Sequence, residues 1–249
     1  MPHRLGKYLL LKSVGESMDN KVYSCIDQET EEISAIKVFI LDGHDSKSKF
    51  EAYQTEVESL ELLAHYPHIV TMLGKCDEAT FLKSDGSSHK VCYIVMELLE
   101  RDIFDYVSMT DTFPAPILRH ILKQLLQAVS FMHSQGYVHR DIKLENCCFD
   151  KDYNIRLCDF SSASAQHKDG LLHMNTMKGT QGYMAPEMLS EGIYKGRDID
   201  IFALGVLLFT LRTKSAPFVS AELKDRAYRL FSLHQFEELW KSYESNFKS

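Results

Sequence analysis

The stretch HRDIKLENCCFDKDYNIRLCDFSS (residues 139–162) concentrates polar groups that could do chemistry. It carries two acids, Asp141 and Asp159, with Lys143 and Asn146 at short spacings between them. A random polar loop would rarely place all four groups at these offsets, so the segment raises the hypothesis of phosphoryl transfer. Ser161 follows Asp159 by two residues, and the rest of the chain must decide which chemistry the segment performs.

Composition bounds the class of protein. The 249 residues are 45% hydrophobic and 25% charged, with a net charge of −7. This length and apolar content suit one large domain or two lobes with real cores. The acidic balance argues against a nucleic-acid binder, which usually has a basic surplus.

Cysteine usage and hydropathy indicate a cytoplasmic protein, with the nucleus left open. None of the six cysteines forms a CxxC pair, so we expect reduced thiols. The N-terminus MPHRLGKYLL lacks the apolar core of a signal peptide. The most apolar run, Ile199–Leu211, is too short to span a bilayer and contains Asp200, so it predicts a buried helix.

The hydrophobic patterning changes along the chain. Short β-rich runs at 6–15, 20–28, 33–41 and 90–98 predict strands, and an Asp-Gly turn within 82–91 predicts a hairpin. Residues 48–66 place Val57, Leu60 and Leu63 on one stripe of a helix. After residue 102, the segment 114–136 predicts a long amphipathic helix that ends before Gly136. A small β lobe therefore precedes a helical lobe, and the cleft between lobes is a common ligand site.

The motifs resemble those of the eukaryotic protein kinase family, from about Tyr8 onward. In order, they are a glycine-loop remnant VGESMDNKVY, AIK, a helix glutamate, HRDIKLEN, DFS, GTQGYMAPE and DIFALG. The resemblance implies the α+β bilobal protein kinase fold over residues 1–249. The N-lobe would be 1–96, the hinge 97–102, and the C-lobe 103–249, the last apparently truncated in its C-terminal helices. Lys143 and Thr180 resemble the serine/threonine type, closest to the calcium/calmodulin-dependent and AMP-activated kinases.

The resemblance assigns roles to the polar residues. Lys37 would contact the α- and β-phosphates of ATP and be held by Glu56, with Glu58 as the competing choice. Asp141 would orient the substrate hydroxyl, and Lys143 would offset charge on the transferring phosphate. Asn146 and Asp159 would bind the metal ion, because their amide and carboxylate oxygens are ligands that suit Mg²⁺.

The same resemblance predicts the nucleotide site. Gly15 remains in the glycine loop, but Ser17 and Asn20 replace the other two glycines, so the loop is weakened rather than abolished. Met96 would be the gatekeeper, and the backbones of Glu97 and Leu99 would bind adenine. The remaining expected contacts with ATP are Val14, Ser17, Val22, Ala35, Asp102, Glu145 and Cys148.

Three expectations concern regulation and substrates. Arg140 would pair with a phosphate on the activation loop, where Thr176 and Thr180 are the candidate residues. Partners would be protein substrates with Ser/Thr targets, with basic residues upstream as a hypothesis. Two further partners are expected: an upstream kinase, or a protein that covers the truncated C-lobe.

Two function classes remain. The first is an active kinase that uses ATP and Mg²⁺, because the full polar set is retained. The alternative is a pseudokinase that binds nucleotide or acts as a scaffold, which the altered glycine loop, Ser161 and the short C-terminus would favour. Ser161 would cost on the order of 1 kcal/mol if its position needs a positive φ.

Overall fold

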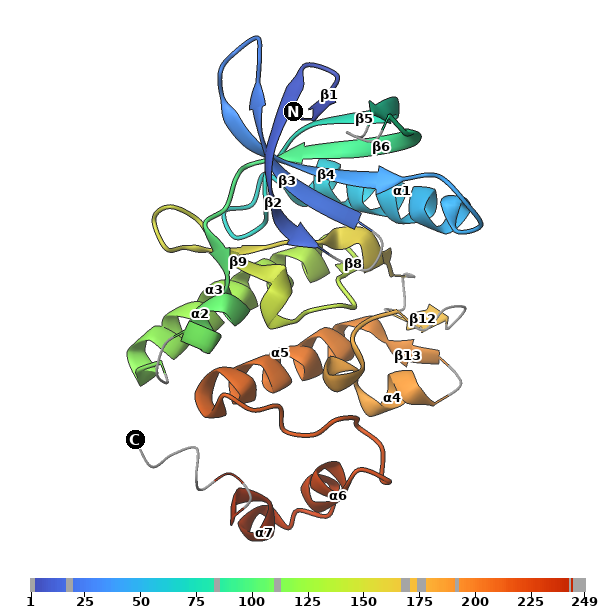
Figure 1. Ribbon diagram of the computed structural model, residues 1–249. Coiled ribbons are helices and arrows are strands. Elements are labelled where there is room, and N and C mark those ends of the chain that lie inside the picture. The colour runs from blue at the N-terminus through green and yellow to red at the C-terminus, as the bar shows by residue number, and fades with distance from the viewer. Residues whose placement is uncertain are drawn as a thin grey trace. The chain divides into compact units, whose positions relative to one another are not determined.

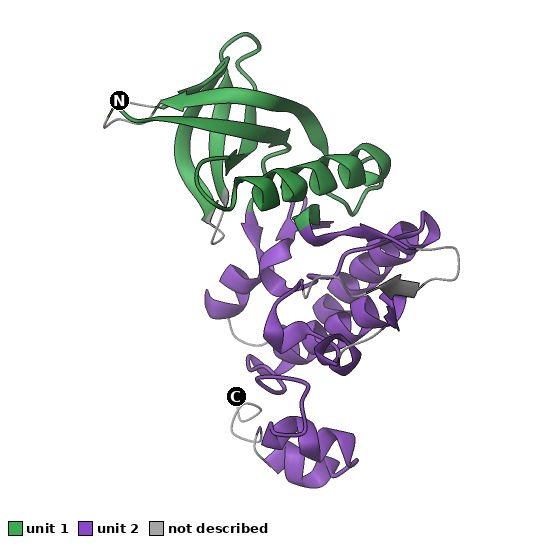
Figure 2. Cartoon of the chain, turned by 90° about the vertical axis from the view of Figure 1, so that its right-hand side faces the viewer, with its two compact units in different colours: residues 1–100, 159–161 green, residues 101–158, 162–249 purple. Residues whose placement is uncertain are grey.

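The structure of the chain is a computed structural model (Figure 1). It describes residues 3–16, 20–82, 86–109, 113–166, 171–173, 178–190, 193–241 and 243. The chain divides into two compact units, residues 1–100 with 159–161, and residues 101–158 with 162–249 (Figure 2). The short segment 159–161 thus groups with the first unit, although its neighbours in sequence belong to the second.

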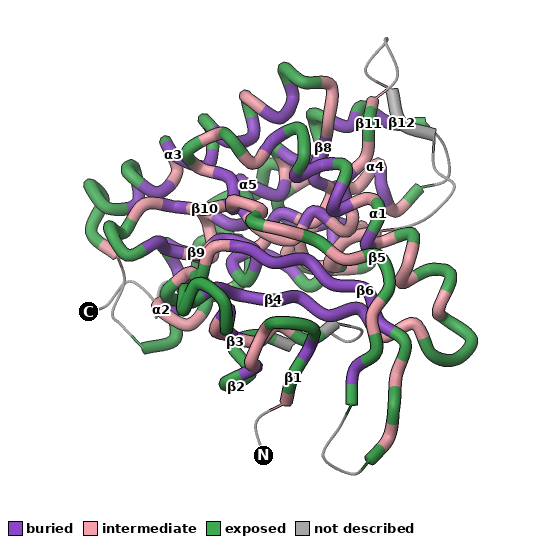
Figure 3. The backbone as a smooth tube through the Cα atoms, turned by 90° about the horizontal axis from the view of Figure 1, so that it is seen from above, coloured by how far each residue is buried: buried purple, intermediate pink, exposed green. Residues whose placement is uncertain are grey.

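The first unit contains a six-stranded antiparallel sheet in the order β1-β2-β3-β4-β6-β5. Short β-rich apolar runs form these strands, and successive side chains point to opposite faces of the sheet. β4 and β6 lie inside the sheet and are buried along most of their length (Figure 3). The strands are β1 (Arg4–Leu5), β2 (Tyr8–Glu16), β3 (Asn20–Asp27), β4 (Ile33–Ile40), β5 (Met72–Leu82) and β6 (Ser88–Met96).

Helix α1 (Ser46–Leu63) packs against β4, β5 and β6 of this sheet. Its buried face includes Val57, Leu60 and Leu63, the stripe expected from their spacing. The opposite face of the sheet covers an apolar cluster. The buried members of that cluster are Leu5, Leu10, Cys25, Ile36, Val38, Phe81, Val91, Tyr93 and Val95.

The second unit is mainly helical, with short strands between its helices. A three-stranded sheet has the order β10-β9-β7, and two strand pairs, β11-β8 and β12-β13, accompany it. The helices are α2 (Ile103–Met109), α3 (Ala115–Ser134), α4 (Pro186–Leu189), α5 (Gly196–Thr213), α6 (Arg226–Ser232) and α7 (Phe236–Lys241). The strands are β7 (Arg101–Asp102), β8 (Tyr137–Val138), β9 (Cys147–Phe149), β10 (Ile155–Leu157), β11 (Ser164–Ala165), β12 (Leu171–His173) and β13 (Ile193–Lys195). The described residues also form 3₁₀ turns: η1 (Leu144–Asn146) and η3 (Gln181–Tyr183) lie in this unit, and η2 (Phe160–Ser162) begins in the first unit and ends in the second.

Helices α3 and α5 pack against each other and carry the second unit's longest apolar stripes. In α3 the spacing of Leu118, Ile121 and Leu125 buries one face. Pro114 occupies the position before the start of α3, and Gly136 lies beyond its end with φ of 78°. The expected buried helix at 199–211 falls inside α5. Among the described residues, no helix is both long and apolar enough to cross a membrane.

The expected fold class is confirmed: a β-sheet lobe with one long helix comes before a helical lobe. The β5–β6 hairpin also forms where it was expected, with residues 83–85 outside the described parts. The two-residue strand β1 was not expected, because Arg4 and Leu5 are too few residues to show alternation.

Candidate active site

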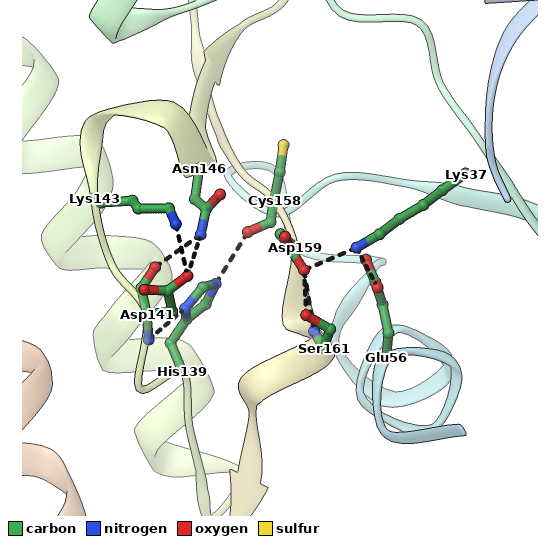
Figure 4. Close-up of polar contacts among 9 residues, drawn as sticks. All are labelled: Lys37, Glu56, His139, Asp141, Lys143, Asn146, Cys158, Asp159 and Ser161. Atoms are coloured by element: carbon green, nitrogen blue, oxygen red, sulfur yellow. Dashed lines mark hydrogen bonds and ion pairs between the residues drawn. The ribbon is translucent and has the colours of Figure 1, made fainter. Parts of the chain in front are cut away.

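A buried cluster in the first unit centres on Lys37 of β4. Its ammonium lies 2.6 Å from Glu56 Oε2 on α1 and 2.8 Å from Asp159 Oδ1 (Figure 4). Lys37 is 4% exposed and Glu56 is 0% exposed. The competing residue, Glu58, is exposed on the same helix. A buried charge is costly unless a group of opposite charge lies beside it, and the Lys37 ammonium and the Glu56 carboxylate are such partners for each other.

The cluster shifts the proton equilibria of its members. Burial raises the pKa of Glu56 to about 7, against the opposing effect of the Lys37 ammonium. Burial alone would lower the pKa of Lys37, but the carboxylates of Asp159 and Glu56 together raise it above its ordinary value. Lys37 therefore stays a cation at neutral pH, while Glu56 can gain a proton in weak acid.

This difference predicts a pH dependence. The carboxylate form of Glu56 is the one that holds the Lys37 cation, and it is lost as the pH falls through about 7. We therefore expect kcat/KM for ATP to fall on the acid side of pH 7. A Glu56→Gln variant, which has no proton to gain, should show a lower rate without that acid limb. Identical pH profiles for the two proteins would contradict this assignment.

A second polar cluster lies in the second unit, around Asp141. Thr180 donates its hydroxyl to Asp141 Oδ1 at 2.8 Å, and Lys143 donates to Thr180 Oγ1 at 2.9 Å. Lys143 also lies 3.0 Å from Asp141 Oδ2. The Asn146 amide nitrogen donates to the Asp141 carbonyl at 2.8 Å and to its Oδ2 at 3.2 Å (Figure 4). The carboxylate is therefore fixed in direction by three side chains.

The backbone beneath this cluster is held by a buried acid. Asp200 of α5 accepts hydrogen bonds from the backbone N–H of His139 at 3.0 Å and of Arg140 at 2.9 Å. His139 Nδ1 accepts from the N–H of Asp141 at 3.3 Å, so its Nε2 is the nitrogen that donates to the Cys158 carbonyl at 3.0 Å. His139 is thus an internal brace for the segment that carries Asp141.

Sequence reasoning missed His133. Its Nε2 lies 2.8 Å from Asp200 Oδ2, so it shares the anchor of the Asp141 segment. A usable signal existed: His133 follows Leu125 and Val129 at four-residue spacing, on the buried face of α3. A polar residue in an apolar stripe needs a buried partner, and Asp200 is that partner.

Gly179 was also missed, and its role is steric. Its φ is 122°, and a Cβ built there would lie 2.7 Å from the Arg140 carbonyl oxygen.

We expect Gly179→Ala to displace Thr180 from Asp141, costing about 1–3 kcal/mol of stability and lowering any transfer rate. Thermal unfolding should show the loss. Gly205→Ala in α5, where a Cβ meets nothing within 4 Å, should be neutral or stabilising. Equal behaviour of the two variants would contradict this explanation.

Arg140 is engaged with the chain beyond Asp159. Its Nε donates to the Ser162 carbonyl at 2.6 Å, and its Nη2 donates to the Ala163 carbonyl at 3.3 Å. Burial lowers the pKa of Arg140, and it outweighs the opposing electrostatic and hydrogen-bonding effects of the Tyr194 phenol. The structure therefore ties Arg140 to the segment that leads into the loop containing Thr176, which itself lies outside the described residues.

The expected adenine-site residues lie on the strands of the first unit and at its end. Ala35 and Met96 are buried and face each other across β4 and β6, whereas Val14 is exposed. Ser17 lies outside the described residues, and of Asn20 only the backbone is described. Gly15 pairs with Val22, and Leu99 is half-buried near the end of the unit.

Three further ATP candidates lie in the second unit. Asp102 Oδ1 accepts from the N–H of Asp105 at 2.8 Å, so it also caps the start of α2, and burial raises its pKa. Cys148 pairs with Asp102 across β9 and β7. Glu145 is exposed in η1.

The residues expected to hold a metal ion fit that task in their chemistry. Asp159 offers a carboxylate, and Asn146 turns its amide nitrogen to Asp141, which leaves the amide oxygen without a donor among the described residues. Carboxylate and amide oxygens are the ligands of hard divalent cations. Clusters of three or more His, Cys, Asp or Glu with metal geometry do not occur in the described parts of the chain.

The comparison with known families identifies the class. The family model of the protein kinase domain matches residues 8–248, so the chain belongs to the protein kinase family. The resemblance drawn from its motifs, including the serine/threonine type, is confirmed. Membership of this family implies the use of ATP and of a divalent metal ion.

Curated relatives agree with this assignment. The CBL-interacting serine/threonine-protein kinase 17 of Arabidopsis thaliana is 34% identical over 232 residues, covering 92% of this chain and 51% of the relative. The liver/testis isoform of the phosphorylase b kinase gamma catalytic chain from Bos taurus is 30% identical over 216 residues, covering 82% and 50%. The CBL-interacting protein kinase 30 of Oryza sativa subsp. japonica is 32% identical over 223 residues, covering 88% and 44%. The chain spans about half the length of these relatives.

Proposed function

We propose that this chain is a serine/threonine protein kinase domain that transfers the γ-phosphate of ATP to serine or threonine hydroxyls of proteins. The observation that carries the proposal is the fixed carboxylate of Asp141, held by Thr180, Lys143 and Asn146 at 2.8–3.2 Å. Its serine/threonine relatives support the same reading. Neither the family match nor those relatives favour the pseudokinase alternative.

In this proposal each polar residue has one task. Asp141 accepts a hydrogen bond from the acceptor hydroxyl and aims its oxygen at the phosphorus, because phosphoryl transfer depends mainly on positioning. Lys143 offsets negative charge on the transferring group. Lys37 holds the α- and β-phosphates and is itself held by Glu56 at 2.6 Å.

Asp159 and Asn146 would hold Mg²⁺ through their oxygens. When bound, the metal neutralises phosphate charge and orients the β- and γ-phosphates. The adenine and ribose would be met by the remaining ATP candidates, with Met96 as gatekeeper, the backbones of Glu97 and Leu99 on adenine, and Val14, Gly15, Ser17, Val22, Ala35, Asp102, Glu145 and Cys148 around them.

Regulation and location form a finer part of the proposal. Arg140 would respond to phosphorylation of the loop at Thr176, since a cation on that segment can pair with a phosphate. An upstream kinase would supply that phosphate. We further propose that the substrates carry basic residues upstream of the target hydroxyl, that a partner covers the second unit, and that the protein is cytoplasmic.

A peptide-library assay tests the proposal. The purified chain is given Mg-ATP labelled on its γ-phosphate and two matched peptide sets, one with Ser/Thr acceptors and one with Tyr. We expect label on the Ser/Thr set, with enrichment of Arg or Lys upstream. Label confined to Tyr peptides would overturn the assigned type. Indifference to Arg and Lys would overturn only the basic-residue preference.

A further inference from the structure

Ser161 is the residue at which this chain departs from the usual Asp-Phe-Gly pattern, and its hydroxyl is engaged. Ser161 Oγ donates to Asp159 Oδ1 at 2.6 Å, and the Ser161 N–H approaches the same oxygen at 3.3 Å (Figure 4). Lys37 donates to that oxygen at 2.8 Å. Three donors from two residues therefore converge on one carboxylate oxygen.

The backbone carries no strain at the serine. Positive φ in this segment falls on Asp159, at 59°, and Ser161 is not among the residues with positive φ. The cost of about 1 kcal/mol was expected only if Ser161 needed a positive φ, so it does not apply here. A glycine at this position would supply the same N–H but no hydroxyl, and it would widen the backbone freedom of η2.

A carboxylate without such contacts turns easily about its terminal torsion. Here Lys37 and Ser161 both donate to Oδ1, so the orientation of the carboxylate plane is fixed. Groups that hydrogen-bond to a metal ligand orient it, and their loss typically costs 10–100-fold in metal affinity.

We propose that Ser161 is a positioning residue, whose hydroxyl fixes the Asp159 carboxylate for divalent-metal binding. This inference rests on the proposed function, in which Asp159 is a metal ligand. In this inference the serine that replaces the usual glycine contributes to the metal site through its hydroxyl.

The test measures metal binding separately from catalysis. Binding of a non-hydrolysable ATP analogue is followed by calorimetry, with Mg²⁺ titrated in one series and chelated in the other. We expect Ser161→Ala and Ser161→Gly to weaken the Mg²⁺-dependent binding about 10-fold, within the range typical for such contacts. Binding of the analogue without metal should not change, because Lys37 is untouched.

Two further variants separate positioning from packing. Ser161→Thr keeps the hydroxyl and should retain most of the Mg²⁺ dependence. Ser164→Ala is the matched control and should bind as the parent does, because the Ser164 hydroxyl donates to the Ala165 carbonyl at 3.3 Å and to no other group in the described parts of the chain. Thermal unfolding of each variant confirms that it is folded, and the Ala, Gly and Thr set remains decisive if one variant misfolds.

Several results would overturn the inference. They are parent-like Mg²⁺ dependence in both Ser161→Ala and Ser161→Gly, tighter metal-dependent binding in Ser161→Gly, or equal losses with and without metal. A parent that binds the Mg²⁺–analogue complex but transfers no phosphate would contradict the proposed function alone. A parent that binds no such complex would overturn both.

Discussion

Replacement of Lys37 by methionine is expected to remove phosphate transfer and to destabilise the first unit. Methionine keeps the length of the side chain, but it leaves Glu56 buried with no cation at 2.6 Å and Asp159 with none at 2.8 Å. Breaking a buried pair by removing one partner costs about 3–5 kcal/mol. Loss of a preorganised cation on the phosphates should lower the transfer rate about 10²–10³-fold.

The two effects can be separated with a second variant. Lys37→Met combined with Glu56→Leu removes both buried charges, so it should recover much of the stability while staying inactive. Chemical denaturation followed by circular dichroism measures the first effect, and labelled phosphate transfer measures the second. A Lys37→Met protein as stable as the parent would show that the buried Lys37–Glu56 pair does not contribute to the free energy of unfolding as expected.

Asp141→Asn is expected to lower the rate of phosphate transfer about 10²–10⁴-fold while Mg-ATP still binds. The asparagine oxygen can accept from Thr180, but its amide group no longer pairs with Lys143 at 3.0 Å. In the parent, the Asn146 amide nitrogen donates to Asp141 Oδ2 at 3.2 Å. In the variant an NH₂ group at the Oδ2 position could not accept this hydrogen bond. The acceptor hydroxyl therefore loses both its orienting charge and a fixed geometry.

Asp152→Asn is the matched control for this variant. Asp152 is exposed, and the variant makes the same chemical change as Asp141→Asn. We expect parent-like rates from Asp152→Asn. If Asp141→Asn kept more than a tenth of the parental rate with normal Mg-ATP binding, Asp141 would not have the role proposed for it.

The sequence allowed the elements and the main polar residues to be predicted because both have local signals. Strand alternation and the helical stripe around Leu60 come from neighbouring residues, and the β4 lysine and the α1 glutamate follow from motif order. The structure then placed Lys37 against Glu56 rather than Glu58, which is consistent with the inward position expected for Glu56.

The supporting contacts could not be predicted, because they join residues far apart in the chain. His133 meets Asp200 across 67 positions, and Gly179 approaches the Arg140 carbonyl only after folding. The role of the Ser161 hydroxyl could not be predicted for another reason. Its residue type suggested a backbone cost, whereas its neighbour Asp159 takes the positive φ and its hydroxyl gains a charged acceptor at 2.6 Å.

The most direct measurement is a single-turnover assay with labelled Mg-ATP and a Ser/Thr peptide library, with parent and Asp141→Asn proteins side by side and nucleotide binding measured on both. The account predicts that the parent labels the peptides, while the variant binds Mg-ATP and transfers at most about a hundredth as fast. If both proteins bind Mg-ATP and neither transfers phosphate, the chain is a nucleotide-binding module, and the central claim is wrong.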